Sequence, residues 1–240
     1  MEFTLLWAAL TAFMAAYVTI RIAKPQVPDR PLDRLVGAAL VGIAVGRIGA
    51  LLMQGTNPIT SPGELLVVRG GVDTVWASLA GITVLTWSLR RSPAALDVIA
   101  PASLAALAGW HGGCLWRSAC LGTMSDLPWA WSLPGSDITR HPVEIYAAVL
   151  LAVGAWFVSR IRYPVGTATA TAVFVAGFAR LTTEPLRPRL GPGPWWFYAS
   201  AVVAGLSWAG WVAVRARRVV GKRPADPYPP RGCQKRSNSR

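Results

Sequence analysis

Charged residues are scarce in this sequence. Asp, Glu, Lys and Arg make up 15% of its 240 residues, whereas 53% are hydrophobic and the mean hydropathy is +0.40. A soluble domain normally carries about 25% charged residues. The low charge therefore excludes an ordinary soluble fold and predicts a protein that crosses a membrane several times.

Cysteine and histidine are also rare, and each shortage excludes a class of protein. The three cysteines, Cys114, Cys120 and Cys233, are too few for a disulfide framework. The first two would nevertheless face an oxidising compartment if their helix ends outside the cell. With only two histidines and no paired C-x-x-C motif, a metal site is the weaker interpretation of the stretch around Cys114, and we expect none.

The net charge of +13 would ordinarily suggest a nucleic-acid partner, but its distribution argues against one. Nine of the 24 Lys and Arg residues lie in 215–240, beyond the last hydrophobic segment. A basic tail of this kind holds anionic lipid headgroups or is disordered. We therefore expect membrane lipids and no nucleic acid as partners, and a basic, disordered cytoplasmic tail at 215–240.

Seven hydrophobic segments are long enough to cross a bilayer, which requires about 17–25 apolar residues. They predict an all-α, polytopic membrane protein with a seven-helix domain over residues 1–214. The segments are Thr4–Ile20, Leu35–Met53, Val72–Leu89, Val98–Trp116, Val143–Val158, Val165–Thr183 and Trp195–Val214. Because the first follows Glu2 rather than a positively charged stretch, we expect it to remain as a span rather than to act as a cleaved signal peptide.

Positive residues mark one side of the membrane. They follow the first, third, fifth and seventh segments, and the opposite side has far fewer. The positive-inside rule then predicts an outside N-terminus and a cytoplasmic C-terminus. Residues 117–142, between the fourth and fifth segments, are expected to form a small periplasmic head.

Three ionisable residues lie inside the predicted spans at similar depths. At about 1.5 Å per helical residue, Arg47, His111 and Arg180 are about 18 to 22 Å from the cytoplasmic ends of their segments. A charge near the bilayer centre costs at least about 2.5–3.5 kcal/mol, so such residues predict a functional site. We expect the three to face one cavity.

The stretch FARLTTEPLR adds charges to this region. Arg180, Glu184 and Arg187 share one face if they are helical, and Pro185 and Pro188 end or kink that helix. Arg180 either extends to the headgroups with Glu184 neutralising it, or helps to bind a lipid phosphate.

A second polar stretch, RHPVEIY, lies where the chain re-enters the membrane. Its proline and Glu144 suit the first turn of a helix, whose positive end favours a carboxylate. His141 is either an ordinary interfacial histidine or a further member of the cavity.

Several motifs resemble those of one membrane enzyme family, the prolipoprotein diacylglyceryl transferases. The most specific are RHPVEIY and GFARLTTEPLR, which are similar to the family's R-H-P-x-Q-x-Y-E and G-x-x-R-F-x-x-E-x-x-R. Supporting motifs are VGRIGALL, DVIAP, the Gly/Cys-rich stretch that ends at Gly122, and PWA at Pro128. Their order and spacing agree with the family from Leu35 to Leu206, as does the seven-span topology.

The resemblance implies transfer of a diacylglyceryl group from phosphatidylglycerol to the lipobox cysteine thiol of a preprolipoprotein, which forms a thioether and releases glycerol phosphate. It implies a multi-pass protein of the bacterial plasma (inner) membrane that recognises phosphatidylglycerol and preprolipoprotein signal peptides, without a metal or organic cofactor. Arg180, Glu184 and His111 are the expected catalytic residues. The expected substrate-binding residues are Arg187, Gly122, Arg140, His141 and Arg47.

The sequence departs from the family pattern at functional positions. The family's histidine on the third span is Val75 here, its arginine and asparagine on the fourth are His111 and Cys114, and its motif glutamine is Glu144. His111 is then either the base for the acceptor thiol, because histidine titrates near working pH, or a cation that binds phosphate. The alternative function is a non-catalytic homologue that binds lipid or a membrane partner.

Overall fold

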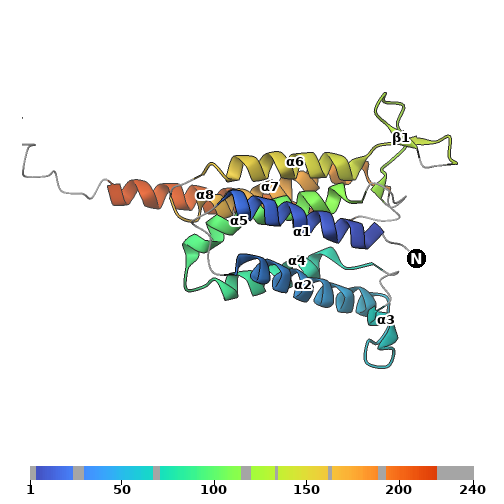
Figure 1. The fold of residues 1–240 in the computed structure, drawn as a ribbon, viewed down its shortest axis with the longest axis horizontal. Helices are drawn as coiled ribbons and strands as arrows, with labels where there is room; N and C mark the ends of the chain where they lie inside the picture. The colour runs from blue at the N-terminus through green and yellow to red at the C-terminus, as the bar shows by residue number, and fades with distance from the viewer. Residues whose placement is uncertain are drawn as a thin grey trace, which may run out of the picture.

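The computed structural model of the chain describes residues 4–23, 30–66, 71–114, 120–132, 135–161, 164–188 and 193–220. This part is mostly helical, and its long helices run side by side along one axis (Figure 1). The long helices are α1 (Thr4–Ile22), α2 (Pro31–Met53), α4 (Thr74–Ser88), α5 (Pro93–Gly112), α6 (Val143–Val158), α7 (Thr167–Thr183) and α8 (Trp195–Val220). Each overlaps one predicted segment, so the all-α prediction is confirmed.

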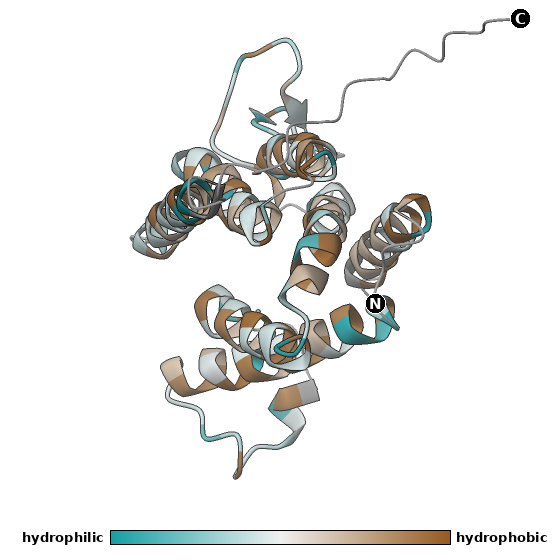
Figure 2. Cartoon of the chain, turned by 90° about the vertical axis from the view of Figure 1, so that its left-hand side faces the viewer, coloured by the Kyte–Doolittle hydropathy of each residue, from teal (hydrophilic) through white to brown (hydrophobic). Residues whose placement is uncertain are grey.

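Three of the described helices are long and apolar enough to cross a membrane by length and composition. They are Pro31–Met53, Pro93–Gly112 and the Trp195–Arg218 part of α8. Large hydrophobic side chains are also widely exposed, for example Leu40, Val153 and Val203, each about 60% exposed. Figure 2 shows hydrophobic residues on the outer faces of the helices as well as between them. A surface this apolar fits lipid rather than water as its surroundings.

Most helix boundaries differ from the prediction by a few residues, and the largest shifts are at the start of α5 and the end of α8. α5 begins at Pro93, about one turn early, because Pro93 occupies the first helical turn, where its missing N–H is not needed. α8 continues to Val220. Arg215, Arg217 and Arg218, assigned to the basic tail, are therefore helical. The rest of the predicted tail, 221–240, lies outside the described residues.

The largest core joins α5, α6 and α7 through small and aliphatic residues. Its members are Ala100, Leu104, Ala105, Leu151, Ala155, Val158, Ala168, Ala172 and Ala179. α1 approaches α5 closely at Gly109, where an added β-carbon would lie 2.4 Å from the backbone oxygen of Thr11. Small residues permit such close packing where lipid supplies no hydrophobic driving force between helices.

α2 and α4 form a separate pair beside this bundle (Figure 1). The pair packs closely at two glycines of α2. Gly42 lies against the backbone of Ala77 in α4, and Gly46 lies against the backbone of Asp73, the residue before α4. A small cluster of Leu89, Ala95 and Ile99, with Leu35, Leu85 and Leu96 around it, joins the pair to α5. The short helix α3 (Gly63–Leu66) follows α2 at the opposite end of the pair.

Asp97 on α5 fixes the start of α7. Gly166 precedes this helix with a φ of 95°, in the left-handed region that favours glycine. One Asp97 oxygen accepts from the Gly166 N–H at 2.5 Å, and the other accepts from the N–H and the hydroxyl of Thr169 at 2.8 and 2.5 Å. Asp97 thus caps α7 from a neighbouring helix.

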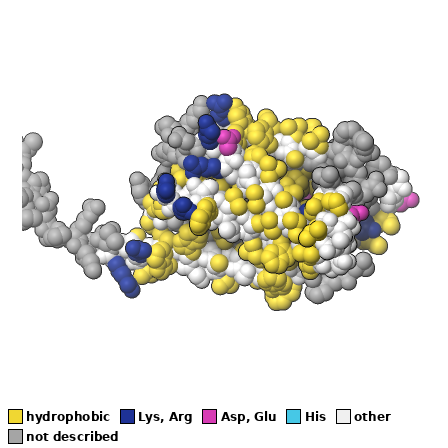
Figure 3. Space-filling model, turned by 90° about the horizontal axis from the view of Figure 1, so that it is seen from below, with side chains coloured by type: hydrophobic (Ala, Val, Ile, Leu, Met, Phe, Trp, Pro, Cys, Tyr) yellow, Lys and Arg dark blue, Asp and Glu magenta, His cyan; other side chains and the backbone are white. Residues whose placement is uncertain are grey.

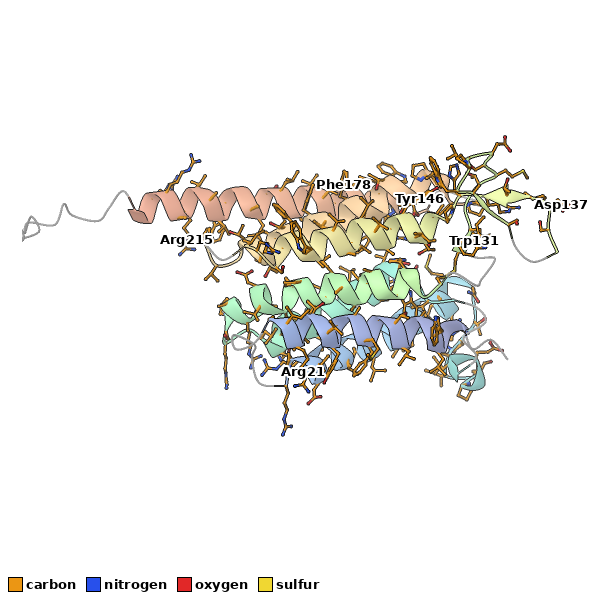
Figure 4. The ribbon with its side chains drawn as sticks, turned by 45° about the horizontal axis from the view of Figure 1, so that its top comes forward. Arg21, Trp131, Asp137, Tyr146, Phe178 and Arg215 are labelled. Carbon is orange, nitrogen blue, oxygen red and sulfur yellow. A yellow bond between two sulfur atoms is a disulfide. The ribbon has the colours of Figure 1, made fainter. Side chains whose placement is uncertain are left out.

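A small head projects at the opposite end from the C-terminus of α8 (Figure 1). It contains the antiparallel strands β1 (Trp131–Ser132) and β2 (Thr139–Arg140), and Met124 forms an isolated bridge with Arg140. In Figure 4, Trp131 and Asp137 mark this end, whereas Arg215 lies toward the other. Where the predicted head at 117–142 is described, it contains this short strand pair and the loops around it.

Candidate active site

Ionisable side chains from three helices meet at the head end of the bundle. His111 lies in the last turn of α5, Glu144 in the first turn of α6, and Arg180 in the last turn of α7. α7 continues directly into the 3-10 helix η3 (Glu184–Leu186), and Arg187 follows. We call His111, Glu144, Arg180, Glu184 and Arg187 the polar cluster.

Glu144 is the centre of the polar cluster and is only 5% exposed. One of its carboxylate oxygens contacts Nδ1 of His111. The other contacts Nη2 of Arg187 and lies 3.7 Å from Nη1 of Arg180. A single buried carboxylate therefore joins three elements, which is how a protein lowers the cost of burying charge.

Arg180 is packed inside the site rather than extended to solvent. Its side chain is 12% exposed, and Nη2 lies 3.7 Å from a carboxylate oxygen of Glu184, four residues later on the helix. Its guanidinium carbon lies 5.4 Å from the ring centre of Tyr198 on α8. Among the described residues, Nη1 is buried without a hydrogen-bond partner, which leaves a donor for an anion.

Gly122 lies between the start of α6 and η3. An added β-carbon would be 2.3 Å from a Val143 methyl and 2.4 Å from the backbone oxygen of Leu186. The next residue, Thr123, donates its N–H to that same Leu186 oxygen at 2.8 Å. The glycine thus allows the chain leaving α5 to lie against η3, beside the polar cluster.

Arg140 and His141 hold the base of the head. Nη1 of Arg140 donates to the Gly122 carbonyl at 3.3 Å, and the His141 carbonyl accepts from the Gly122 N–H at 2.7 Å. The His141 ring lies 3.4 Å from the hydroxyl of Tyr146, which also accepts from the Trp129 indole at 2.9 Å. These contacts place both residues next to the cluster, and their contact with substrate stays a prediction.

Arg47, expected in the same cavity, has different surroundings. Its side chain is 5% exposed, Nε and Nη2 donate to the Glu64 carbonyl at 3.1 and 2.8 Å, and Nη1 donates to the Gly71 carbonyl at 2.9 Å. These contacts join α2 to α3 and to the segment before α4. The structure thus brings His111 and Arg180 to one carboxylate and gives Arg47 partners on the α2–α4 side.

Cys114 and Cys120 form a disulfide, which the sequence left open. The bond joins a cysteine three residues after His111 to a cysteine two residues before Gly122. It ties the end of α5 to the loop that packs against η3, and a disulfide is expected only in an oxidising compartment. This agrees with an α5 that ends outside the cell.

Sequence reasoning missed Glu144 as a site residue because a carboxylate in the first turn of a helix needs no further explanation. The available signal was its place in the RHPVEIY motif, where the resembling family has glutamine. An acid in place of an amide adds a negative charge next to Arg180 and Arg187.

Comparison with known proteins identifies the family of this sequence. The sequence profile of the prolipoprotein diacylglyceryl transferases matches residues 3–218, which is nearly the whole described chain. The chain belongs to the prolipoprotein diacylglyceryl transferase family. The resemblance predicted from the motifs is thereby confirmed over a longer region than Leu35 to Leu206.

Two relatives of the family illustrate the similarity. A phosphatidylglycerol–prolipoprotein diacylglyceryl transferase of Cupriavidus necator is 27% identical over 222 residues, covering 80% of each chain. Another of Rhizobium meliloti is 32% identical over 164 residues, covering 61% of this chain and 57% of its own length. The match to this second transferase therefore spans little more than half of that protein.

Proposed function

We propose that this protein is a phosphatidylglycerol–prolipoprotein diacylglyceryl transferase of the bacterial plasma membrane. The observation that carries the proposal is the approach of Arg180 and Arg187 to one buried carboxylate at the head end of the bundle. Two guanidinium groups at one point suit a lipid phosphate, because each offers planar pairs of donors. Family membership and the names of the relatives support the same reaction.

The proposed reaction replaces a carbon–oxygen bond by a carbon–sulfur bond. The acceptor thiol loses its proton, and the thiolate attacks the glycerol carbon that bears the phosphate. The carbon–oxygen bond breaks, and its electron pair leaves with glycerol phosphate. Arg180 and Arg187 stabilise the charge that develops on the departing phosphate, which is most effective in a site shielded from water.

The proposed topology has seven spans, an outside N-terminus and a cytoplasmic C-terminus. Four arginines support this orientation, because each lies over an aromatic ring near the C-terminal end of a helix that begins at the head end (Figure 1). The pairs are Arg21 with Tyr17, Arg90 with Trp87, Arg160 with Trp156 and Arg215 with Trp211, with 4.0 to 5.1 Å between guanidinium carbon and ring centre.

The surface pattern supports the same placement. In Figure 3, hydrophobic side chains cover the middle of the visible face, and most visible Lys and Arg lie toward the end where α8 finishes. Cationic residues at one end suit the anionic lipids of the cytoplasmic leaflet. The polar cluster then lies near the outer leaflet, where preprolipoprotein signal peptides present their cysteine.

Complementation tests the proposed function. The full chain is expressed in a bacterial strain depleted of its own diacylglyceryl transferase, and the mobility of a model lipoprotein reports lipid attachment. We expect growth and the lipidated form with the natural sequence, and neither with Arg180→Ala. Membrane expression with no lipidated product would support the non-catalytic alternative, a homologue that binds lipid or a membrane partner.

A further inference from the structure

His111 is the one imidazole of the polar cluster, and its ring can take the proton of the acceptor thiol. Both arginines are permanent cations and cannot accept a proton. The oxygens of Glu144 already face His111 Nδ1, Arg187 and Arg180. A carboxylate engaged by three donors is a poor acceptor for another proton, whereas the imidazole has a second nitrogen that Glu144 does not occupy.

The contact with Glu144 defines the tautomer of His111. An ionised carboxylate only accepts hydrogen bonds, so the proton of a neutral His111 lies on Nδ1 and is donated to Glu144. The lone pair is then on Nε2, on the opposite side of the ring. A carboxylate that fixes the tautomer and orientation of a histidine base in this way is a recurring device in enzymes.

We propose that Glu144 is the positioning residue that holds His111 as the base for the acceptor thiol. This inference rests on the transferase function proposed above and assigns separate roles to His111 and Glu144. The thiol proton moves to Nε2 of His111, and the thiolate sulfur bonds to the glycerol carbon as the carbon–oxygen bond to phosphate breaks. The proton then passes from Nε2 to the departing phosphate or to water, which restores the neutral ring.

The charges of the polar cluster are balanced before the proton moves. Arg180 and Arg187 balance Glu144 and Glu184, so the cluster carries no net charge while His111 is neutral. Proton uptake by His111 adds one positive charge while the departing phosphate gains negative charge. The same proton transfer thus activates the nucleophile and strengthens the site for the leaving group.

The tautomer is measured directly by ¹⁵N NMR of the full-length protein in phosphatidylglycerol-containing nanodiscs with ¹⁵N-labelled histidine. Its two histidines, His111 and His141, give signals that a His141→Asn variant assigns. We expect His111 to carry its proton on Nδ1 and to lose this preference in Glu144→Leu, which has no hydrogen-bond acceptor. A proton on Nε2, or no change in Glu144→Leu, would overturn the proposal whether or not the protein transfers lipid.

Kinetics then separate positioning from folding. With a synthetic lipobox peptide, Glu144→Gln should lower kcat about 100-fold, within the range for general acid–base groups, and leave KM for phosphatidylglycerol equal or lower. Free imidazole should restore part of the activity of His111→Ala, and much less in His111→Ala combined with Glu144→Gln. Asp137→Asn, an exposed carboxylate of the head, is the matched control and should behave like the natural sequence.

Unchanged kcat in Glu144→Gln, or a parallel loss of kcat and lipid affinity, would overturn the positioning role. If the natural sequence itself transfers no diacylglyceryl group, the proposed function is contradicted. The NMR result would still decide whether Glu144 orients His111.

Discussion

Replacing Gly122 by alanine should damage both stability and transfer. The new methyl would lie 2.3 Å from a Val143 methyl and 2.4 Å from the Leu186 oxygen, about 1 Å inside the 3.4–4 Å of ordinary contact. Overpacking costs about 1–3 kcal/mol, and loss of the Thr123 bond to Leu186 costs about 0.5–1.5 kcal/mol more. We expect a free energy of unfolding lower by about 1.5–4.5 kcal/mol.

The same change should lower kcat about 100-fold, because Val143 precedes Glu144 and Leu186 precedes Arg187, and a misplacement of about 1 Å can cost this much. Thermal unfolding in detergent and transfer to a lipobox peptide measure the two effects. Gly37→Ala is the matched control, since an added β-carbon there meets nothing within 4 Å. Wild-type stability and kcat in Gly122→Ala would refute the packing argument.

Three further predictions concern the scaffold, the phosphate and the topology. Asp97→Ala removes three hydrogen bonds at the start of α7 and should lower stability by about 1–3 kcal/mol, with KM unchanged in protein kept cold; unaltered thermal unfolding would contradict the capping role. Arg180→Lys keeps the charge but loses the planar donor pair, so lipid binding should weaken, and Arg180→Ala should weaken it further; equal binding by all three proteins would exclude a phosphate contact. A reporter that is active only in the periplasm should be silent when fused after Arg218, and activity there would reverse the proposed orientation.

The sequence predicted the helices well because their signal is local. A run of apolar residues identifies a buried or lipid-facing helix without knowledge of its neighbours, and all seven predicted segments contain a helix. The errors lie at the helix ends, because capping residues rather than hydrophobicity determine where a helix begins and ends. α5 begins at Pro93, before its predicted start. α8 continues beyond the apolar run by which it was predicted, and it includes three arginines there.

The site was harder to predict because it depends on which helices are neighbours in the membrane plane. The sequence gives only the depth of a residue along its own helix, and Arg47, His111 and Arg180 have similar depths. The packing of α5, α6 and α7 brings the last two to Glu144, whereas α2 directs Arg47 to Glu64 and Gly71. The pairing of α2 with α4 depends on the whole fold, and the spacing of residues within one segment does not predict it.

We propose that this protein moves a diacylglyceryl group from phosphatidylglycerol to a cysteine thiol. The most direct test mixes the purified full chain with vesicles of phosphatidylglycerol and a lipobox peptide, and weighs the peptide by mass spectrometry. We expect a peptide heavier by one diacylglyceryl group on its cysteine, with glycerol phosphate released, and no such product with Arg180→Ala. An unmodified peptide in the presence of folded, lipid-bound protein would contradict it.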